Sequence, residues 1–404
     1  MSRLEELLDE LCPDGVEYKT IEEIAIDIFR GSGIKRDEVT EEGIPCVRYG
    51  EIYTTYGIWF DECVSHTSES AVASKKYFEY GDILFAITGE SVEDIAKSCA
   101  YVGHEKCLAG GDIVVLKHNQ NPKYLSYALS TTDARMQKSK GKVKSKVVHS
   151  SVPAIKSIRI PIPPLEIQEE ITVLLDSFMM SHSNLEYGLN EELNHRKEQF
   201  EYYKEQIFSF DDVEHNTVEK VMTFTNGKGH ERSVALDGKY IVVNSKFIST
   251  NGEVKKYSNH QIVPVFKDDI LMVMSDLPNG RALARTFFVE KDETYTLNQR
   301  ICRLAVLDKS EYIPKFLYYY LDRNPQLLAY DNGIDQTNLK KGDILDVKIP
   351  KLPVEKQRSM VNNLDNLTKW YEELAIAIES EIVNRQKQYE FYRDKLISFK
   401  EKTA

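Results

Sequence analysis

Residues 160–168 read Ile-Pro-Ile-Pro-Pro-Leu-Glu-Ile-Gln, and residues 349–357 read Ile-Pro-Lys-Leu-Pro-Val-Glu-Lys-Gln. The offset that aligns these two stretches also pairs, without a gap, Asp176 with Asp365, Leu185 with Leu374, Glu192 with Glu381, Arg196 with Arg385, Tyr203 with Tyr392 and Ser209-Phe210 with Ser398-Phe399. A single register kept from residue 160 to residue 210 indicates an internal duplication, which has to be identified before any fold is assigned.

Weaker matches lie upstream of both stretches. Residues 16–22 match 213–219, residues 81–84 match 268–271, and residues 121–125 match 313–317. The residues between these matches differ freely. The two halves therefore share a scaffold, and they diverge mainly outside the segments that follow residues 165 and 354.

The upstream segments, 13–160 and 211–348, have the pattern of β-rich domains. Short apolar runs at 44–52, 83–87, 240–248 and 270–274 are bounded by Gly, Asp and Asn, which is typical of strands. Each segment also contains one predicted helix. The first begins at Pro122 and runs to about Lys138, and the second begins at Pro314, because proline is favoured in a first helical turn.

The segments after residues 165 and 354 are predicted to be long amphipathic helices. Apolar or aromatic residues recur at steps of three and four, which is the pattern of a coiled-coil seam. They are Ile171, Leu175, Phe178, Leu185, Leu189, Leu193, Phe200, Tyr203 and Ile207, and then Met360, Leu364, Leu367, Tyr371, Leu374, Ile378, Ile382, Tyr389, Tyr392 and Leu396. The simplest arrangement packs the two helices on each other, antiparallel; the alternative is that each helix packs on its own β-rich domain.

The predicted fold is α+β, with four parts at 1–160, 161–210, 211–348 and 349–404. A short helix with a stripe at Leu4, Leu7, Leu8 and Leu11 precedes the first β-rich domain, just as the first long helix precedes the second. The C-terminal helix would therefore return to the N-terminus, which gives a circular arrangement of two equivalent halves.

Composition sets limits on the class of protein. The chain has 404 residues, 42% of them apolar, enough for two or three domains with ordinary cores. It contains no run of eighteen apolar residues and no signal-peptide core near its acidic start. Its six cysteines form no Cys-x-x-Cys pair, which favours a reducing compartment, and we expect a cytoplasmic protein.

The net charge of −12 argues at first sight against a nucleic-acid-binding protein. The charge is uneven, however, since residues 165–208 carry ten acidic against three basic residues. The acidic excess therefore lies mainly on the helices. Basic clusters within the nearly neutral β-rich segments can still form a local DNA-binding surface.

No signature of catalysis is present. The sequence lacks a GxxxxGK phosphate loop and the paired motifs of adenine methyltransferases, and Asn121-Pro122-Lys123-Tyr124 is explained by a helix start. A zinc site is possible at one group of cysteines and histidines, but buried core cysteines and surface histidines are the favoured explanation. The group is Cys63, His66, Cys99, His104 and Cys107. We expect no catalytic, cofactor-binding or metal-binding residues in this chain.

Basic and polar clusters supply the candidate DNA-binding residues. Five lysines occur at every second position of one segment. If this segment is extended, they would present one row of ammonium groups to a phosphate backbone; the alternative is a solvated loop. They are Lys138, Lys140, Lys142, Lys144 and Lys146. Arg48-Tyr49 and Asn244-Ser245-Lys246 occupy corresponding positions after an apolar strand, where Arg suits guanine and Asn suits adenine. The other candidates are Arg30, Lys35 and Arg36 in the first half, and Lys228, His230, Arg232, Arg281 and Arg285 in the second.

With these residues in place, the chain resembles the specificity subunits of type I restriction-modification enzymes. The resemblance rests on Leu-Cys-Pro-Asp-Gly-Val-Glu-Tyr at 11–18 and on Ile-Pro-x-x-Pro-x-Glu-x-Gln before each long helix. It implies two target-recognition domains, each reading one half of a split site in double-stranded DNA. It implies helices that act as a spacer and dock two methyltransferase subunits, to which restriction subunits can be added. S-adenosylmethionine and ATP are then expected on those partners and not on this chain.

Two observations leave alternatives open. Residues 335–339 read Asp-Gln-Thr-Asn-Leu, the form associated with the family, whereas the corresponding stretch of the first half reads Val147-Val148-His149-Ser150. A shared role for this loop is therefore in doubt. A coiled-coil scaffold that does not bind DNA is the alternative function, and a single-chain enzyme is disfavoured by the missing motifs.

Overall fold

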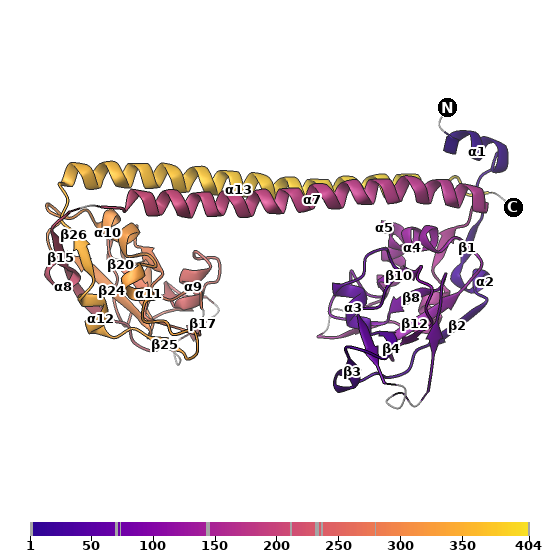
Figure 1. Ribbon diagram of the computed structural model, residues 1–404, viewed down its shortest axis with the longest axis horizontal. Coiled ribbons are helices and arrows are strands. Elements are labelled where there is room, and N and C mark those ends of the chain that lie inside the picture. Colours follow the sequence, from indigo (N-terminus) through magenta and orange to yellow (C-terminus); the bar gives the residue numbers. More distant parts are fainter. Residues whose placement is uncertain are drawn as a thin grey trace. The chain divides into compact units, whose positions relative to one another are not determined.

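The computed structural model describes residues 3–68, 72, 74–142, 146–210, 212–230, 234–235, 237–278 and 280–402. The chain forms two compact units. The first unit comprises Met1–Asn190 with Ile378–Ala404, and the second comprises Glu191–Ala377. The division falls within both long helices, α7 (Leu165–Ile207) and α13 (Val354–Leu396), so each unit contains a β-rich domain and part of each helix (Figure 1).

The first unit contains two five-stranded sheets. One has the order β2 (Asp27–Arg30), β12 (Ile113–Lys117), β8 (Ile83–Ala86), β10 (Ser98–Tyr101), β5 (Trp59–Phe60), and the other β3 (Val39–Thr40), β6 (Ser65–Thr67), β4 (Ile44–Val47), β11 (Cys107–Ala109), β7 (Tyr77–Phe78). Two short pairs are β1 (Tyr18–Thr20) with β14 (Arg159–Pro161) and β9 (Thr88–Gly89) with β13 (Val148–His149). The shorter helices are α1 (Arg3–Leu11), α2 (Ile21–Ile24), η1 (Arg36–Glu38), α3 (Tyr49–Thr54), α4 (Pro122–Ser130), α5 (Thr132–Ser139) and α6 (Val152–Lys156).

The second unit repeats this design with two four-stranded sheets. One has the order β16 (Met222–Asn226), β24 (Ile301–Val306), β20 (Ile270–Val273), β22 (Thr286–Phe288), and the other β17 (Val234–Ala235), β19 (Tyr257–Ser258), β18 (Tyr240–Val243), β23 (Tyr295–Leu297). The short pairs are β15 (His215–Thr217) with β26 (Lys348–Pro350) and β21 (Ser275–Asp276) with β25 (Thr337–Asn338). The shorter helices are α8 (Val218–Val221), α9 (Ser245–Ser249), α10 (Pro314–Leu321), α11 (Pro325–Leu328) and α12 (Lys341–Leu345).

The duplication predicted from the sequence is confirmed by the strand pairing. In each unit, a strand at the start of the β-rich domain pairs antiparallel with the strand that precedes a long helix. The stretch whose sequences differ most, around Val148 in one half and Thr337 in the other, forms the same short antiparallel pair in both. This loop therefore has the same structural position in both halves.

Each β-rich domain has two hydrophobic cores on opposite sides of its central strand. In β8, Ile83 and Phe85 enter one core while Leu84 and Ala86 enter the other, because successive side chains of a strand point to opposite faces. In β20, Ile270 and Met272 are separated from Leu271 and Val273 in the same way. A continuous apolar run is therefore a strand buried on both faces.

The long helices pack antiparallel, as predicted. In the first unit Phe178 stacks on Tyr392, with ring centroids 6.1 Å apart, and in the second unit Phe200 stacks on Tyr371 at 4.8 Å. The beginning of each helix also packs on its β-rich domain, since Ile171 of α7 and Met360 of α13 each enter a domain core. Both predicted modes of packing therefore occur, at different positions along each helix.

The C-terminus returns to the N-terminal segment within the first unit, which confirms the predicted circular arrangement. The Val16 amide donates to the Lys400 carbonyl (2.9 Å), and the Lys402 amide donates to the Val16 carbonyl (3.0 Å). Leu4 and Leu7 of α1 share a core with Ile397. The end of α13 therefore joins the start of the chain.

Three predicted elements are wrong in their extent. The strands expected at 44–52 and 240–248 end at Val47 and Val243, and each is followed by a short helix. The helix expected from Pro122 to about Lys138 is broken at Thr131. The Thr131 hydroxyl donates to the Ala128 carbonyl and accepts from the Ala134 amide, which ends α4 and caps α5.

Candidate nucleic-acid interface

Three segments of the first β-rich domain meet where its two sheets join, and we call them the first junction loops (30–33, 48–49 and 110–112). The Gly110 amide donates to the Val47 carbonyl (2.9 Å), and Ser32 forms an isolated bridge with Gly110. A Cβ atom at Gly31 would lie 2.2 Å from the Gly110 carbonyl oxygen, so this approach requires glycine. The structure thus brings Arg30 and Arg48 to one edge of the domain.

The second β-rich domain assembles corresponding segments, the second junction loops (226–230, 244–246 and 297–300). The Asn298 amide donates to the Val243 carbonyl (3.1 Å), and the Lys228 amide donates to the Leu297 carbonyl (3.2 Å). A Cβ atom at Gly227 would lie 1.8 Å from the Asn298 carbonyl oxygen. The two glycines have the same structural role, so the predicted correspondence between Arg48 and Asn244 is also spatial.

The capping roles of Arg48 and Asn244 occupy part of their polar surface. Asn244 caps α9, since its side-chain oxygen accepts from the Phe247 amide (2.9 Å). Arg48 precedes α3, and its Nε donates to Glu51 Oε1 (2.9 Å). The remaining N–H groups of each side chain stay able to donate to a base edge or a phosphate. Tyr49 is 40% exposed beside them.

The other predicted residues have different surroundings. Arg30 pairs with Asp112, and Lys35 with Glu38 (3.4 Å); Arg36 is exposed in η1, and Lys246 lies in α9. His230 is buried, with Nε2 2.9 Å from Thr296 Oγ1. Arg232 and Lys144 lie outside the described residues. Sequence reasoning missed Arg300 of the second junction loops, an exposed arginine with a φ of 67°.

The predicted row of five lysines is wrong in its geometry. Lys138 lies inside α5, is 6% exposed, and donates to Ser98 Oγ (3.1 Å). The chain then turns, since the Lys142 amide donates to the Ser139 carbonyl (3.0 Å). Lys140 and Lys146 are exposed. The alternation of lysines is therefore not a strand, because the first of them belongs to a helix that packs on a sheet.

A buried glutamine fastens each β-rich domain to a long helix. Gln168 Oε1 accepts from the Asn121 amide (3.0 Å), and its Nε2 donates to the Pro163 carbonyl (2.8 Å). Gln357 makes the same contacts to the Ile313 amide (2.9 Å) and the Leu352 carbonyl (2.9 Å). Both glutamines have no exposed surface. The last residue of the repeated Pro-x-Glu-x-Gln motif is thus a structural clamp between helix and domain.

A lysine, a tyrosine and an aspartate form a second repeated clamp about two turns further along each helix. In the first unit Asp176 accepts from Lys123 Nζ (2.7 Å) and from the Tyr127 hydroxyl (2.7 Å). In the second unit Asp365 accepts from Lys315 Nζ (2.8 Å) and from the Tyr319 hydroxyl (2.6 Å). Two clamps on one helix fix the rotation of the β-rich domain as well as its position.

Gln168→Leu tests the first clamp. We expect the variant to unfold at lower urea concentration, with a loss of about 2–4 kcal/mol, because the Asn121 amide and the Pro163 carbonyl stay buried without partners. Gln206→Leu is the matched control, since Gln206 is an exposed glutamine of the same helix. Equal unfolding midpoints for the two variants would show that the clamp contributes nothing.

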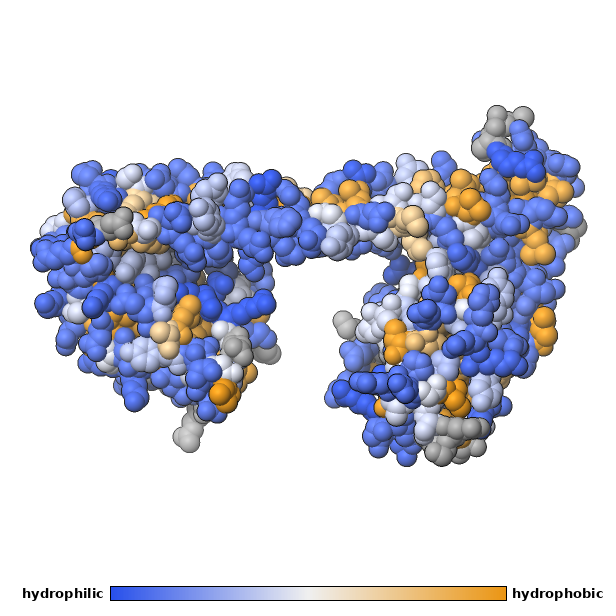
Figure 2. All heavy atoms as spheres, viewed as in Figure 1, coloured by the Kyte–Doolittle hydropathy of each residue, from blue (hydrophilic) through white to orange (hydrophobic). Residues whose placement is uncertain are grey.

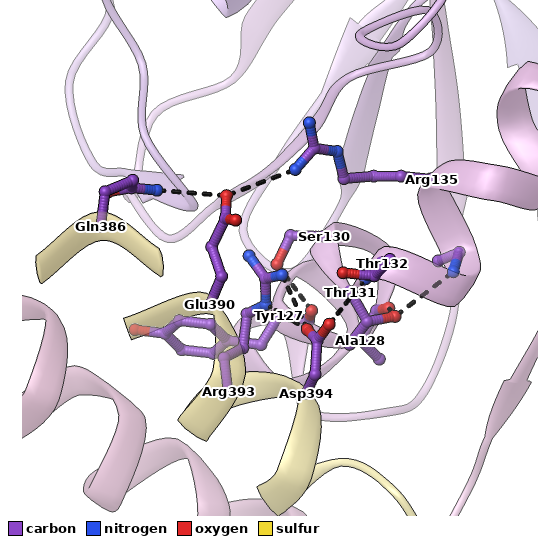
Figure 3. A network of polar contacts seen from close by, with 11 residues as sticks. Tyr127, Ala128, Ser130, Thr131, Thr132, Arg135, Gln386, Glu390, Arg393 and Asp394 are labelled. Carbon is purple, nitrogen blue, oxygen red and sulfur yellow. Dashed lines mark hydrogen bonds and ion pairs between the residues drawn. The ribbon is translucent and has the colours of Figure 1, made fainter. Parts of the chain in front are cut away.

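The first unit carries an additional latch between α5 and the end of α13 (Figure 3). The Thr132 amide donates to Asp394 Oδ2 (3.1 Å), and Asp394 Oδ1 accepts from Arg393 Nη2 (2.7 Å). Arg135 bridges Asp94 (3.7 Å) and Glu390 (3.4 Å). The start of α5 is therefore tied to the C-terminal helix.

The cysteines and histidines of the possible zinc site do not form a set of metal ligands, although two of the cysteines are in contact. Cys63 hydrogen-bonds with Cys107, whereas the His104 ring stacks on Tyr80 at 6.2 Å. The hydrogen bond with Cys107, together with burial, raises the pKa of the Cys63 thiol. Among the described residues, no three His, Cys, Asp or Glu side chains are grouped as metal ligands.

The strand order, the duplicated clamps and the two sets of junction loops define a twofold-repeated binding module, and comparison with known proteins identifies it. The chain belongs to the family of the type I restriction modification DNA specificity domain, whose profile matches residues 13–195 and 211–384. Each half of the chain therefore contains one copy of this domain.

Curated relatives and solved structures agree with this assignment. The chain is 28% identical over 268 residues to the type I restriction enzyme EcoR124I/EcoR124II specificity subunit of Escherichia coli; the match covers 60% of this chain and 63% of that protein, less than two thirds. A chain solved in a study of complex assembly of the type I R-M system has a similar fold, with a TM-score of 0.74, 16% identity and coverage of 95% and 97%. The HsdS subunit from Thermoanaerobacter tengcongensis has a TM-score of 0.52, 16% identity and coverage of 96% and 97%.

Within the part of the chain that the structure describes, none of the helices combines the length and apolar character that crossing a bilayer requires.

Proposed function

We propose that this chain selects the DNA on which a type I restriction-modification complex acts, with each β-rich domain reading one half of a split site in double-stranded DNA. The observation that carries this proposal is that corresponding junction loops, on the same scaffold, hold different side chains in the two halves. Arg48 in one half suits guanine and Asn244 in the other suits adenine. A duplicated scaffold with divergent contact residues is suited to reading two different half-sites.

The contacts divide into two kinds in this proposal. Arg48, Tyr49, Asn244, Ser245 and Lys246 face base edges and determine sequence. The remaining candidate cations contact phosphates and set the register of the protein on the DNA. They are Arg30, Lys35, Arg36, Lys140, Lys142, Lys144 and Lys146 in the first half, and Lys228, Arg232, Arg281 and Arg285 in the second. Lys138 is not among them, because it is buried and donates to Ser98 Oγ.

The long helices would set the distance between the half-sites and dock two methyltransferase subunits. Helices keep large apolar side chains exposed where a partner covers them, and Figure 2 shows apolar groups along both helices. The exposed ones are Val173, Phe178, Met180, Leu185, Tyr187, Tyr202 and Tyr203 of α7, and Trp370, Ile376, Val383, Phe391 and Tyr392 of α13. Restriction subunits would join the same complex.

In this proposal the chain itself is not catalytic and acts in the cytoplasm. S-adenosylmethionine and ATP would be bound by the methyltransferase and restriction subunits, and this chain would hold no cofactor. Its parts would be a first recognition domain at 1–160, a spacer helix at 161–210, a second recognition domain at 211–348 and a second spacer helix at 349–404.

Exchange of residues 211–348 for the corresponding segment of another family member tests the proposal. Sequencing of methylated bases in cells that also express the partner subunits should show one half-site changed, with the other half-site and the spacer retained. The chain with residues 211–348 replaced by its own segment through the same cloning junctions is the control. A change in both half-sites would contradict independent reading.

A further inference from the structure

The second unit contains a cleft of about 930 Å³ between its β-rich domain and the long helices, and we call it the arginine cleft. Its floor includes Tyr318 and Tyr319 of α10, and its helical wall includes Lys204 of α7 and Tyr371 of α13. Three arginines, Arg281, Arg285 and Arg323, line the domain side. The three arginines on the domain side make the cleft a candidate site for an anion.

The guanidinium groups of two of these arginines meet at one oxygen atom. Arg285 Nε donates to the Arg281 carbonyl (3.2 Å), and Arg323 Nη1 donates to the same carbonyl (2.8 Å). Their positive charges are thus held side by side. Like charges at this separation repel each other, so the arrangement is favourable when an anion lies between or against them.

The surrounding carboxylates do not neutralise this pair. Asp322, adjacent in sequence, is already occupied: its Oδ2 accepts from Lys204 Nζ (2.9 Å) and its Oδ1 from the Thr286 amide (3.0 Å). Glu201, Glu205 and Glu372 also line the cleft. Across the described residues, however, neither these acids nor any other carboxylate forms an ion pair with Arg281, Arg285 or Arg323.

The backbone that presents the arginines adopts an unusual conformation. Ala284 and Arg323 have φ values of 57° and 51°, a region that L-residues rarely occupy. The Arg323 amide donates to the Ala284 carbonyl (2.9 Å), which joins the two segments. This hydrogen bond fixes the segment that carries Arg323 beside the segment that carries Arg281 and Arg285.

The corresponding segment of the first unit carries different cationic side chains. Ala96 there has a φ of 59°, like Ala284, and is followed by Lys97, where the second unit has Arg285. The nearby arginine, Arg135, is bound to Asp94 and Glu390, both carboxylates of the first unit. Figure 3 shows the contact with Glu390. Arg135 is therefore held between two carboxylates in the first unit, whereas no ion pair among the described residues involves Arg281, Arg285 or Arg323.

We infer that the arginine cleft binds a backbone phosphate of duplex DNA and so anchors the second recognition domain without reading sequence. Guanidinium groups bind phosphate oxygens through paired N–H groups, and Arg285 and Arg323 present adjacent donors. This inference rests on the proposed function, since it requires DNA to pass the cleft. It assigns a role to Arg323, which no pattern in the sequence marks.

The test compares DNA affinity at several salt concentrations for the complex reconstituted with its methyltransferase subunits. Loss of the one phosphate contact that both arginines make, in Arg285→Gln/Arg323→Gln, should reduce the magnitude of the slope of log K against log [salt] by about 0.9. The ratio of wild-type to variant affinity should therefore fall by about 3.5-fold between 50 and 200 mM salt. The methylated sequence should stay the same, because phosphate contacts carry no base information.

Two further variants make the result specific. Lys220→Gln, which removes an exposed cation of α8 outside the cleft lining, should leave the slope unchanged. Arg285→Lys/Arg323→Lys keeps both positive charges and should recover most of the wild-type slope. Such recovery would show that the glutamine variant changes the slope through loss of charge and not through misfolding.

An unchanged slope for the glutamine variant, in a complex that still methylates its split site, would overturn the inference and leave the proposed function intact. Saturable binding of inorganic pyrophosphate to the wild-type chain, together with an unchanged DNA slope, would assign the cleft to a small phosphate ligand and also overturn it. Failure of the wild-type complex to bind any DNA would instead refute the proposed function.

Discussion

Lys138→Met is expected to stabilise the first unit by about 2–4 kcal/mol at pH 7. Lys138 is buried in α5, and burial, together with the positive charge of Arg135, lowers the pKa of its ammonium group to about 7. In the unfolded chain this ammonium group has a pKa of about 10.4. At neutral pH the folded chain therefore binds the proton less tightly than the unfolded chain does, and this difference lowers the free energy of unfolding. Methionine removes the charge and keeps a similar side-chain length, although the hydrogen bond to Ser98 is lost.

The destabilisation of the folded chain by Lys138 depends on pH, because the folded and unfolded chains lose this proton at different pH. Between pH 7 and about 10 the unfolded wild-type chain binds one more proton at this residue than the folded chain does, so stability rises with pH over that window. Below pH 7 both states are protonated, and the destabilisation is present in full. The difference in unfolding free energy between Lys138→Met and wild type should therefore shrink as pH rises from 7 towards 10.

Urea denaturation at pH 7 and pH 9.5 measures that difference. Lys140→Met is the control, because Lys140 is exposed at the end of the same helix and should change stability little at either pH. A Lys138→Met chain that is less stable than wild type at pH 7, with the same difference at pH 9.5, would contradict the buried-charge explanation.

The sequence predicted the helical part of the fold well, and the reason is local. A helix that starts at a proline-rich motif and keeps an apolar stripe leaves a periodic signal, so α7 and α13 were predicted from their own residues. The strand ends were missed because Val47 and Val243 are followed by further apolar residues that belong to α3 and α9. Apolar content alone does not separate a strand from a short buried helix.

The candidate interface was predicted only in part. The correspondence between Arg48 and Asn244 was visible because the duplication aligns them, and the repeated Gln168 and Gln357 would have been equally visible as clamp residues. Arg323 had no such signal, because its neighbours Arg281 and Ala284 come from a distant part of the chain. Lys138 was misassigned because alternation in sequence does not report the helix that contains it.

Deletion of seven residues from each long helix, 187–193 and 376–382, is expected to shorten the spacer of the methylated site by about three base pairs. Seven residues correspond to roughly 10.5 Å of helix, and each base pair of duplex DNA to about 3.4 Å. Seven is also the period of a coiled-coil seam, so the paired side chains on either side keep their register. Both clamps lie outside the deleted stretches, so each recognition domain keeps its attachment.

A matched control separates length from lost partner contacts. Tyr187→Ser/Ile376→Ser removes two exposed side chains from the same stretches without changing helix length. This variant should methylate the wild-type site with its original spacer, even if its affinity for the methyltransferase subunits falls.

The central claim is that two recognition domains read separate half-sites at a distance set by the helices, and sequencing of methylated bases in cells that express the deletion variant with its partner subunits tests it most directly. The predicted result is that both wild-type half-sites are retained and the spacer between them is shorter by about three base pairs. An unchanged spacer between the same half-sites would contradict it.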